Sequence, residues 1–335
     1  MARLDIEFCG IRSPNPFWLA SAPPTDKAYN VERAFEAGWG GVVWKTLGEA
    51  GPPLVNVSGA RYGALLAADR SLIGFNNIEL ITDRDLEANL EEIAAVKRRW
   101  PDRAMVVSIM GVDPETLTMT PAVGGKGSHG GYCGPAVKPI ALNMVAEIAR
   151  DPQTAGLPIS GIGGIGSWRD ALEFIALGAG SIQVCTAAMV FGFKIVQEMA
   201  NGLATYLDAK GFASVAQLRG RALASVTDWS RLDLNRVSKA VIDQDKCIQC
   251  GRCHIVCEDT EHQAITATKD GRRHFEVKEE ECVGCNLCVS ICPVPECITL
   301  RDLAPGEVDR RTGRVVSATR LDWTAHPNNP LRTTG

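Results

Sequence analysis

The segment AMVVSIMGVDPETLTMTPAVGGKG, residues 104–127, decides how much of a fold this chain can build. Its first seven residues have the apolar, β-branched composition of a buried strand. A loop with glycine and proline follows, where the chain elsewhere places a helix. The segment therefore predicts a strand whose following helix is missing.

On both sides of this segment the chain alternates short apolar strands with amphipathic helices. A βαβ unit opens it, with a helix in NVERAFEAGWG that stops at Gly38. Alternation of this kind predicts an α/β fold with a parallel sheet or barrel covered on both faces. The predicted helices after the opening unit lie at about 83–100, 134–151 and 167–180. The five predicted barrel-type strands are 16–23, 40–47, 104–110, 157–163 and 181–187.

Length and charge exclude several classes of protein. A chain of 335 residues has room for about two domains. Its net charge of -4 and pI near 5.8 lack the basic footprint of a nucleic-acid-binding protein. No apolar run reaches the roughly 18 residues that cross a membrane, and residues 1–10 do not resemble a secretory signal. We therefore expect a cytoplasmic protein with no nucleic-acid or membrane partner.

The cysteines mark a second domain. Nine of the twelve fall between Cys247 and Cys297. They include two runs, CIQCGRCHIVC from Cys247 and CVGCNLCVSICP from Cys282, that share the spacing C-x2-C-x2-C-x3-C and so indicate an internal duplication. The predicted domains are a β/α barrel at 1–200, a helical and irregular connection at 201–240, a ferredoxin-like domain at 241–300 and an extended tail at 301–335.

The spacing of each cysteine run suits a cubane iron–sulfur cluster. Three thiolates in a tight loop reach three irons of one cluster, whereas the fourth lies too far along the chain and ligates the other cluster. Zinc is a weaker interpretation, because zinc ribbons pair two C-x2-C units on each metal. Glu258 stands where a proline usually follows such a run. Cys297 is surplus to the two runs, and we expect it to be a buried structural thiol rather than a ligand. One [4Fe-4S] cluster is expected on Cys247, Cys250, Cys253 and Cys292, and the other on Cys257, Cys282, Cys285 and Cys288.

A glycine loop, GIGGIG at 161–166, lies between a predicted strand and a predicted helix. Dinucleotide binding would also require an acidic residue at the end of the next strand, where this chain has Cys185 and Thr186, so NAD binding is disfavoured. In a (β/α)8 barrel the loops after strands seven and eight form a phosphate site instead. Gly163 and Gly164 would then hold a cofactor phosphate together with Cys185 and Thr186. FMN is the phosphate cofactor that exchanges single electrons with iron–sulfur clusters.

Two further polar residues have more than one interpretation. Lys45 and Thr46 end the second strand, where barrel active sites lie, and the lysine could stabilise a reduced flavin. A lysine at such a position is equally a solvated surface residue. Asn77, in GFNNIEL, is either functional or a loop residue that forms a turn.

Long segments of the chain together resemble the flavin and iron–sulfur subunit of bacterial NAD-dependent dihydropyrimidine dehydrogenase. They are NPFWLASAPPT, AFEAGWGGVVWKT, FNNIELIT, HGGYCGPAVKPIALNMVAEIARDP, GIGGIG, QVCTAAM and both cysteine runs. The resemblance implies an FMN-binding barrel fused to a two-cluster ferredoxin domain. It also implies that electrons pass from NADH through an FAD-containing partner subunit, the clusters and FMN to the 5,6 double bond of uracil or thymine, reversibly. The implied FMN positions are Ser21, Lys45, Thr46, Gly134, Ile162, Gly163, Gly164, Cys185 and Thr186, and Asn77 is the implied pyrimidine contact.

The chain departs from that family at the opening segment. The family's Asn-x-x-Cys-Pro motif on strand four, whose cysteine is the general acid, is absent, as are its strand-five lysine and strand-six Asn-Thr pair. Residues 112–134 resemble the loop after strand six, joined to strand three near 110–112. We therefore expect a (β/α)8 TIM-barrel-like domain that lacks three β/α units, strands 4–6, beside an α+β two-cluster domain. Cys133 and His129 match ordinary family positions, so neither is expected to replace the acid.

Two functions remain open at this point. One is the family's reduction of a pyrimidine. The alternative is a catalytically defective, shortened chain that acts only in iron–sulfur electron transfer or partner binding. A dihydroorotate dehydrogenase-like activity is disfavoured, because those catalytic chains usually lack the ferredoxin appendage.

Overall fold

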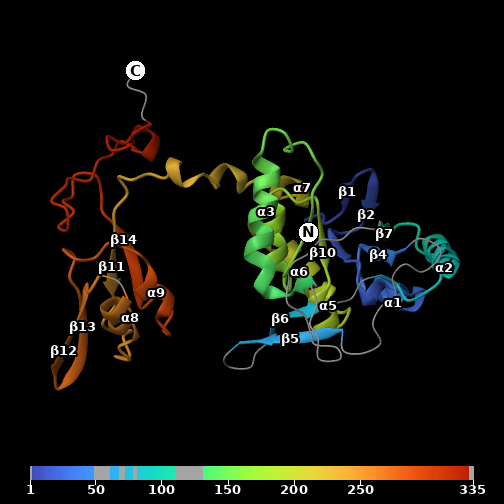
Figure 1. Ribbon diagram of the computed structural model, residues 1–335, viewed down its shortest axis with the longest axis horizontal. Helices are drawn as coiled ribbons and strands as arrows, with labels where there is room; N and C mark the ends of the chain where they lie inside the picture. The colour runs from blue at the N-terminus through green and yellow to red at the C-terminus, as the bar shows by residue number, and fades with distance from the viewer. Residues whose placement is uncertain are drawn as a thin grey trace. The chain divides into compact units, whose positions relative to one another are not determined.

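The computed structural model describes residues 2–48, 61–67, 72–77, 81–109, 131–260 and 262–331. The chain divides into two compact units, Met1–Val226 and Thr227–Gly335 (Figure 1). This division falls inside the connection expected at 201–240, because helix α6, Ile195–Ala209, and the turns after it pack with the first unit.

The first unit is built on one parallel sheet of five strands, in the spatial order β7-β4-β3-β10-β9. Every pairing between neighbours in it is parallel. Each strand overlaps one of the five strands expected from the sequence, so that prediction is confirmed. The bounds are β3 Phe17–Leu19, β4 Gly41–Leu47, β7 Ala104–Ile109, β9 Ser160–Ile162 and β10 Ser181–Val184.

The order of these strands identifies which part of a barrel is present. β3, β4 and β7 follow one another as strands one, two and three, and β10 pairs with β3 as the last strand of a barrel pairs with the first. β9 then occupies the place of strand seven. Within the described residues the sheet ends at β7 and β9, as expected for a half-barrel without strands 4–6.

Helices connect and cover these strands. Helix α1 ends at Gly38, whose φ of 116° is suited to glycine and whose N–H bonds to the carbonyls of Ala34 and Phe35. Within the described ranges no helix has the length and apolar composition needed to cross a membrane. The helices are α1 Ala28–Ala37, α2 Leu86–Arg99, α3 Lys138–Arg150, α4 Trp168–Ala176, α5 Thr186–Phe191, α6 Ile195–Ala209 and α7 Val215–Leu218, with 3-10 turns η1 Pro23–Thr25, η2 Pro135–Val137 and η3 Leu223–Ser225.

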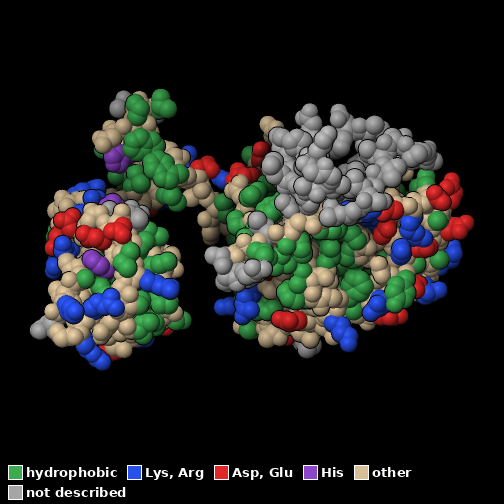
Figure 2. Space-filling view, turned by 60° about the horizontal axis from the view of Figure 1, so that its bottom comes forward, with side chains coloured by type: hydrophobic (Ala, Val, Ile, Leu, Met, Phe, Trp, Pro, Cys, Tyr) green, Lys and Arg blue, Asp and Glu red, His purple; other side chains and the backbone are tan. Residues whose placement is uncertain are grey.

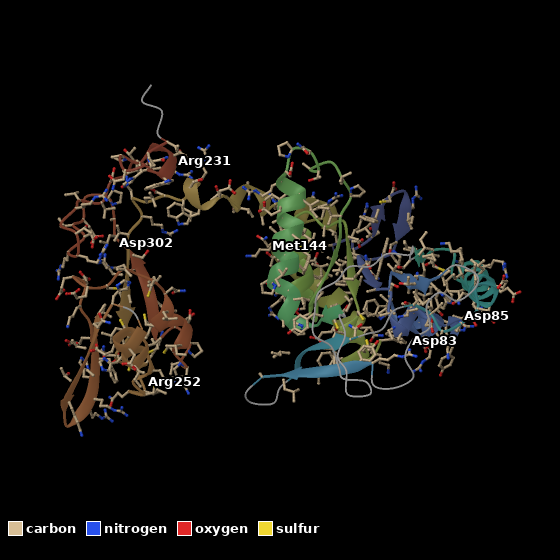
Figure 3. All side chains as sticks on the ribbon, in the orientation of Figure 1. Asp83, Asp85, Met144, Arg231, Arg252 and Asp302 are labelled. Carbon is tan, nitrogen blue, oxygen red and sulfur yellow. The ribbon has the colours of Figure 1, made fainter. Side chains whose placement is uncertain are left out.

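The half-barrel has its own core but leaves apolar positions open at its ends. Trp18, Trp39 and Trp44 are fully buried, and burying a large apolar side chain contributes about 1.5–3 kcal/mol. By contrast, Ile109 on the edge strand β7 is 80% exposed. Helix α3 carries an exposed apolar stripe that includes Met144, labelled in Figure 3. These positions lie where additional β/α units would pack in a complete barrel.

Two antiparallel sheets in this unit were not predicted. One is the hairpin of β1, Ile6–Phe8, and β2, Ile11–Ser13. The other has the order β5-β6-β8, with β5 Tyr62–Leu66, β6 Leu72–Asn77 and β8 Gly131–Cys133. Of the two interpretations of Asn77, the turn-forming loop residue does not fit, because Asn77 is the last residue of β6 and pairs with Gly131.

The second unit repeats one small motif twice. In each copy, a strand leads to a cysteine loop, a short helix and a second strand, which agrees with the duplication expected from the sequence. The elements are β11 Ser238–Ile242, α8 Arg252–Thr260, β12 Ile265–Asp270, β13 Arg272–Val277, α9 Leu287–Ile291 and β14 Ile298–Asp302, with turns η4 Trp229–Arg231 and η5 Trp323–Ala325. β11 pairs with β14, and β12 pairs with β13.

The C-terminal segment beyond β14 has little regular structure but is anchored to this unit. The N–H of Leu234 donates to the carbonyl of Leu321 at 2.7 Å. Asp309 is buried against Lys239 of β11, with 2.7 Å between Nζ and Oδ1. The segment therefore folds back onto the strand that opens the unit.

Candidate functional site

A cavity of about 550 Å³ opens at the carboxyl ends of β9 and β10. This is the end of a parallel sheet at which β/α enzymes bind ligands, and the volume lies in the usual range for a small-molecule site. Six of the nine residues expected to hold FMN line it. They are Gly134, Ile162, Gly163, Gly164, Cys185 and Thr186.

Backbone geometry explains the glycines of this cavity. Gly163 and Gly164 have φ values of 122° and 70°, which residues with a Cβ rarely adopt. A Cβ at Gly164 would lie 2.8 Å from the carbonyl oxygen of Gly134 and 2.9 Å from the nitrogen of Lys138. The loop can therefore keep this conformation against Gly134 and Lys138 only if residue 164 is glycine.

Asp170 holds the same loop in place. Its carboxylate accepts hydrogen bonds from the N–H of Gly166 at 3.1 Å and from Ser167 Oγ at 2.8 Å, and it pairs with Lys138 Nζ at 2.5 Å. Burial raises the pKa of Asp170, but the bonds from Lys138, Ser167 and Gly166 outweigh it and leave that pKa below its ordinary value. The carboxylate therefore stays charged at neutral pH and keeps the loop ordered.

Three hydroxyls form a row across neighbouring strand ends. Thr46 Oγ1 lies 3.0 Å from Ser21 Oγ and 3.0 Å from Ser108 Oγ. Ser21 and Thr46 were expected at FMN positions, whereas Ser108 was missed. Ser108 could have been identified from its place near the carboxyl end of the predicted strand 104–110, because the active sites of β/α barrels lie at the carboxyl ends of their strands.

Lys45 is buried, which contradicts its interpretation as a solvated surface residue. Only 3% of it is exposed, and its charge acts on both Asp26 and Cys185. Burial raises the pKa of Cys185 to about 12, and nearby Cys133 adds to this, while Lys45 opposes it. The Cys185 thiol therefore remains protonated at neutral pH, and Lys45 provides a cation beside it.

Asn77 reaches the same region from the antiparallel sheet. Its Nδ2 lies 3.8 Å from Cys133 Sγ, and Cys133 lines the glycine cavity. The pairing of β6 with β8 thus brings the expected pyrimidine contact to the rim of the expected flavin site. His129, considered with Cys133 as a proton donor, lies outside the described residues.

The second unit contains a cavity lined by four cysteines drawn from both runs. They are Cys257, Cys282, Cys285 and Cys288. Backbone N–H groups point at two of these sulfurs, from Ala264 to Cys257 at 3.3 Å and from Ala240 to Cys282 at 3.5 Å. Four thiols with N–H donors to sulfur form a donor set suited to an iron–sulfur cluster.

A second group of cysteines also mixes the two runs. Cys297 lies close to both Cys247 and Cys292, and its thiol donates a hydrogen bond to the carbonyl of Asp243 at 3.7 Å. Cys253 lies close to Cys247 and Cys250. Burial, followed by these neighbouring thiols, raises the pKa of Cys297 to about 12. Cys297 is 2% exposed, so it is the buried thiol that the sequence indicated.

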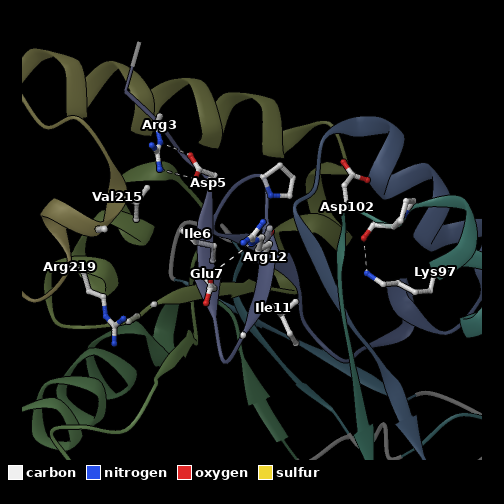
Figure 4. A pocket seen from close by; sticks show the side chains of 17 residues that line it. Arg3, Asp5, Ile6, Glu7, Ile11, Arg12, Lys97, Asp102, Val215 and Arg219 are labelled. Atoms are coloured by element: carbon white, nitrogen blue, oxygen red, sulfur yellow. Dashed lines mark hydrogen bonds and ion pairs between the residues drawn. The ribbon is translucent and has the colours of Figure 1, made fainter.

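A larger hollow, of about 870 Å³, lies at the amino-terminal ends of the strands beside β1 and β2 (Figure 4). Its charged side chains bond to protein groups, such as Arg3 to Asp5 at 3.0 Å and Lys97 Nζ to the carbonyl of Arg103 at 2.8 Å. None of the expected site residues lines it. This end of a β/α sheet serves stability rather than chemistry, so size alone does not make the hollow the active site.

A half-barrel with a glycine cavity, followed in the chain by a unit with a cysteine cavity, is the arrangement of a β/α flavin oxidoreductase with an iron–sulfur domain, and the family comparisons support this class. Residues 87–207 match the dihydroorotate dehydrogenase family, and residues 240–300 match the 4Fe-4S dicluster domain. The two matches suggest FMN and [4Fe-4S] clusters as the cofactors.

The chain belongs to the family of the NAD-dependent dihydropyrimidine dehydrogenase subunit PreA, which confirms the resemblance found in the sequence. It is 32% identical to that protein from Escherichia coli K12 over 408 aligned positions, which cover 92% of this chain and 97% of the relative. The chloroplastic dihydropyrimidine dehydrogenase (NADP+) of Arabidopsis thaliana is 26% identical, over 74% of this chain and 83% of its own length. The catalytic subunit of dihydroorotate dehydrogenase B from Pyrococcus horikoshii is 47% identical, over 28% and 30%.

The alignment with the Escherichia coli protein also bears on the half-barrel. A span of 408 positions that includes 92% of a 335-residue chain leaves about 100 positions at which this chain has no residue. Three β/α units of a barrel occupy about 75–95 residues, because eight units together make up about 250. The size of the difference therefore agrees with the absence of strands 4–6 from the described sheet.

Proposed function

We propose that this chain is the FMN and iron–sulfur subunit of a dihydropyrimidine dehydrogenase, which reduces the 5,6 double bond of uracil or thymine. The observation that carries the proposal is the pair of ligand-shaped sites, a glycine cavity at the carboxyl edge of the half-barrel and a cysteine cavity in the second unit. The resemblance to the family implies that electrons from NADH enter through a partner subunit that holds FAD. This agrees with the end of the strand after GIGGIG, where the chain has Cys185 and Thr186 instead of the acidic residue that binds a dinucleotide ribose.

The iron–sulfur part of the proposal assigns the ligands across the two runs. Cys257 joins Cys282, Cys285 and Cys288 in one cavity, and Cys292 approaches Cys247 through Cys297. We therefore assign one cluster to Cys257, Cys282, Cys285 and Cys288, and the other to Cys247, Cys250, Cys253 and Cys292.

The flavin part of the proposal rests on the residues around the glycine cavity. Gly163 and Gly164 would hold the phosphate of FMN, helped by the first N–H groups of α5, which have no acceptors within that helix. When bound, FMN supplies hydride transfer to the pyrimidine. Lys45 places a buried cation near the site, and Asn77 would contact the substrate at the rim.

Substituting Gly164→Ala is expected to weaken FMN binding at least about tenfold, since the added methyl group would meet the Gly134 carbonyl and force the loop to move. A fluorescence titration with FMN measures this. Gly211→Ala is the matched control, because Gly211 has a φ of 73° but no atom within 4 Å of its Cβ position. Equal loss of FMN binding in both variants would contradict a role for Gly164 at the cofactor.

Proton delivery favours a second candidate function. Reduction of the double bond needs a general acid as well as a hydride, and the family's cysteine motif for that role is absent from the sequence. A positioned acid contributes about 10²–10⁴-fold to the rate of such reactions. The second candidate is therefore a chain that passes electrons through its clusters without reducing a pyrimidine efficiently.

The test is to purify the chain with its partner subunit and to measure iron, flavin and uracil-dependent oxidation of NADH. We expect a full complement of iron, less than one flavin per chain, and turnover lower by about 10²–10⁴-fold than in a relative that has the acid. Full flavin and normal turnover would show that the shortened barrel is competent. A preparation without iron would overturn both candidate functions.

A further inference from the structure

Each cysteine loop of the second unit has an exposed cysteine, Cys250 in the first run and Cys285 in the second, and the basic side chains described next lie at the loop of Cys250. Cys250, assigned above to a cluster, is exposed, and its neighbour Ile248 is 64% exposed. A cluster held there would lie close to the surface, which is where an electron could enter. An exposed apolar side chain beside such a point is typical of a contact with another protein.

Basic side chains gather around this loop. An Arg273 guanidinium nitrogen lies 3.5 Å from the position a Cβ would take at Gly251, so Arg273 reaches the turn that follows Cys250. Arg252 is the next residue, and Lys269 stands directly opposite Arg273 in the hairpin of β12 and β13. All three side chains are exposed. Figure 3 labels Arg252 at the start of α8, and Figure 2 shows Lys and Arg side chains grouped on the second unit.

This group, called here the basic patch and defined as Arg252, Lys269 and Arg273, has an electrostatic cost. Like charges directly opposite each other on neighbouring strands destabilise a hairpin, and Lys269 and Arg273 are such a pair. No carboxylate of the described residues forms an ion pair with any of the three, although the chain as a whole is acidic. The hairpin of β12 and β13 therefore holds two positive charges, Lys269 and Arg273, opposite each other next to the Cys250 loop.

We infer that the basic patch and the Cys250 loop form the docking surface for the acidic face of a flavin-bearing electron donor. The inference rests on the proposed function, because it requires a cluster at Cys250. Oppositely charged surfaces steer association and can raise its rate by about 10–10³-fold at low salt. Electrons then enter through the cluster of Cys247, Cys250, Cys253 and Cys292 rather than through the other one.

The test reverses the charges of the patch in the full chain with its clusters. Reduced flavodoxin, a small acidic flavoprotein, is mixed with the chain in a stopped-flow instrument, and bleaching of the iron–sulfur absorbance gives the rate. Lys269→Glu/Arg273→Glu should lower the rate at least about tenfold at low ionic strength and weaken its dependence on salt. Arg98→Glu/Lys210→Glu is the matched control, because it reverses two exposed basic residues of the first unit.

A second probe separates docking from damage to the structure. Oxidation of the reduced chain by cytochrome c, a basic protein, should be as fast in the patch variant as in the parent, or faster. Rates that fall with both probes, or with neither, would overturn the docking surface. Iron and absorbance are measured first, so a chain that holds no clusters would overturn the proposed function together with this inference.

Discussion

Substituting Cys257→Ser should remove about four of the eight irons that two [4Fe-4S] clusters contain, and these irons should come from the cluster of the second cysteine run. The reason is that Cys257 lines a cavity with Cys282, Cys285 and Cys288, although it belongs to the first run. If each cysteine run supplied all four ligands of one cluster, the variant would lose the cluster of the first run instead. Iron and acid-labile sulfide per chain, with the electron paramagnetic resonance of the reduced protein, measure the loss.

Double substitutions decide which thiols share a cluster. Because two ligands of one cluster act as a unit, Cys257→Ser/Cys282→Ser should lose no more iron than either single change. By contrast, Cys257→Ser/Cys250→Ser should lose nearly all of it. Cys9→Ser is the control, since Cys9 is exposed and lies in the first unit. If Cys257→Ser/Cys282→Ser instead lost nearly all of the iron and Cys257→Ser/Cys250→Ser lost only half, each run would supply all four ligands of its own cluster.

The variant Lys239→Met should destabilise the second unit by about 3–5 kcal/mol, because it leaves the buried carboxylate of Asp309 without its partner. Lys239 is 1% exposed, and its Nζ also donates to the carbonyls of Glu279 at 2.9 Å and Cys282 at 2.7 Å. Loss of the cluster absorbance during urea titration measures the stability. Lys239→Met/Asp309→Leu should recover part of the loss, since an apolar pair leaves no uncompensated charge.

The same ion pair predicts a dependence on pH. Burial raises the pKa of Asp309, but hydrogen bonds from Lys239 and Thr312 outweigh it and leave the pKa below its ordinary value. A carboxyl with a lowered folded pKa adds stability above its unfolded pKa, near about 3.9, and loses it as pH falls through the folded value. The difference in the free energy of unfolding between the parent and the variant Lys239→Met/Asp309→Leu should therefore become smaller below about pH 4. A gap that stayed constant to pH 2 would contradict a charged Asp309.

The sequence predicted the five strands of the half-barrel because each is a continuous apolar run flanked by helical spacing. It did not predict the sheet of β5, β6 and β8, whose last strand, β8, is only three residues long and pairs with β6 more than 50 residues earlier in the chain. Pairing of that kind leaves no local pattern. The pairing of Asn77 with Gly131 depends on the same contact between distant segments, so the sequence left the role of Asn77 open.

Burial was also hard to foresee at the site. The residues next to Lys45 in the sequence are compatible with either a solvated or a buried lysine. The structure buries Lys45 near Cys185, which lies 140 positions further along the chain. The grouping of the cysteines was easier, because the spacing within a short loop limits which sulfurs can meet. Asp309 lay in a segment without periodicity, and its ion pair depends on Lys239 at the other end of the unit.

The first and last strands of the second unit, β11 and β14, are antiparallel neighbours, and this has a consequence for how the chain evolved. The two ends of the β11–β14 segment therefore lie side by side, and the N–H of Leu303 also donates a hydrogen bond to the carbonyl of Val237 at 2.9 Å. A module whose ends meet can be added to a host chain without stretching either one. The β11–β14 segment therefore has the geometry of an insertable module, since both of its ends leave from the same edge.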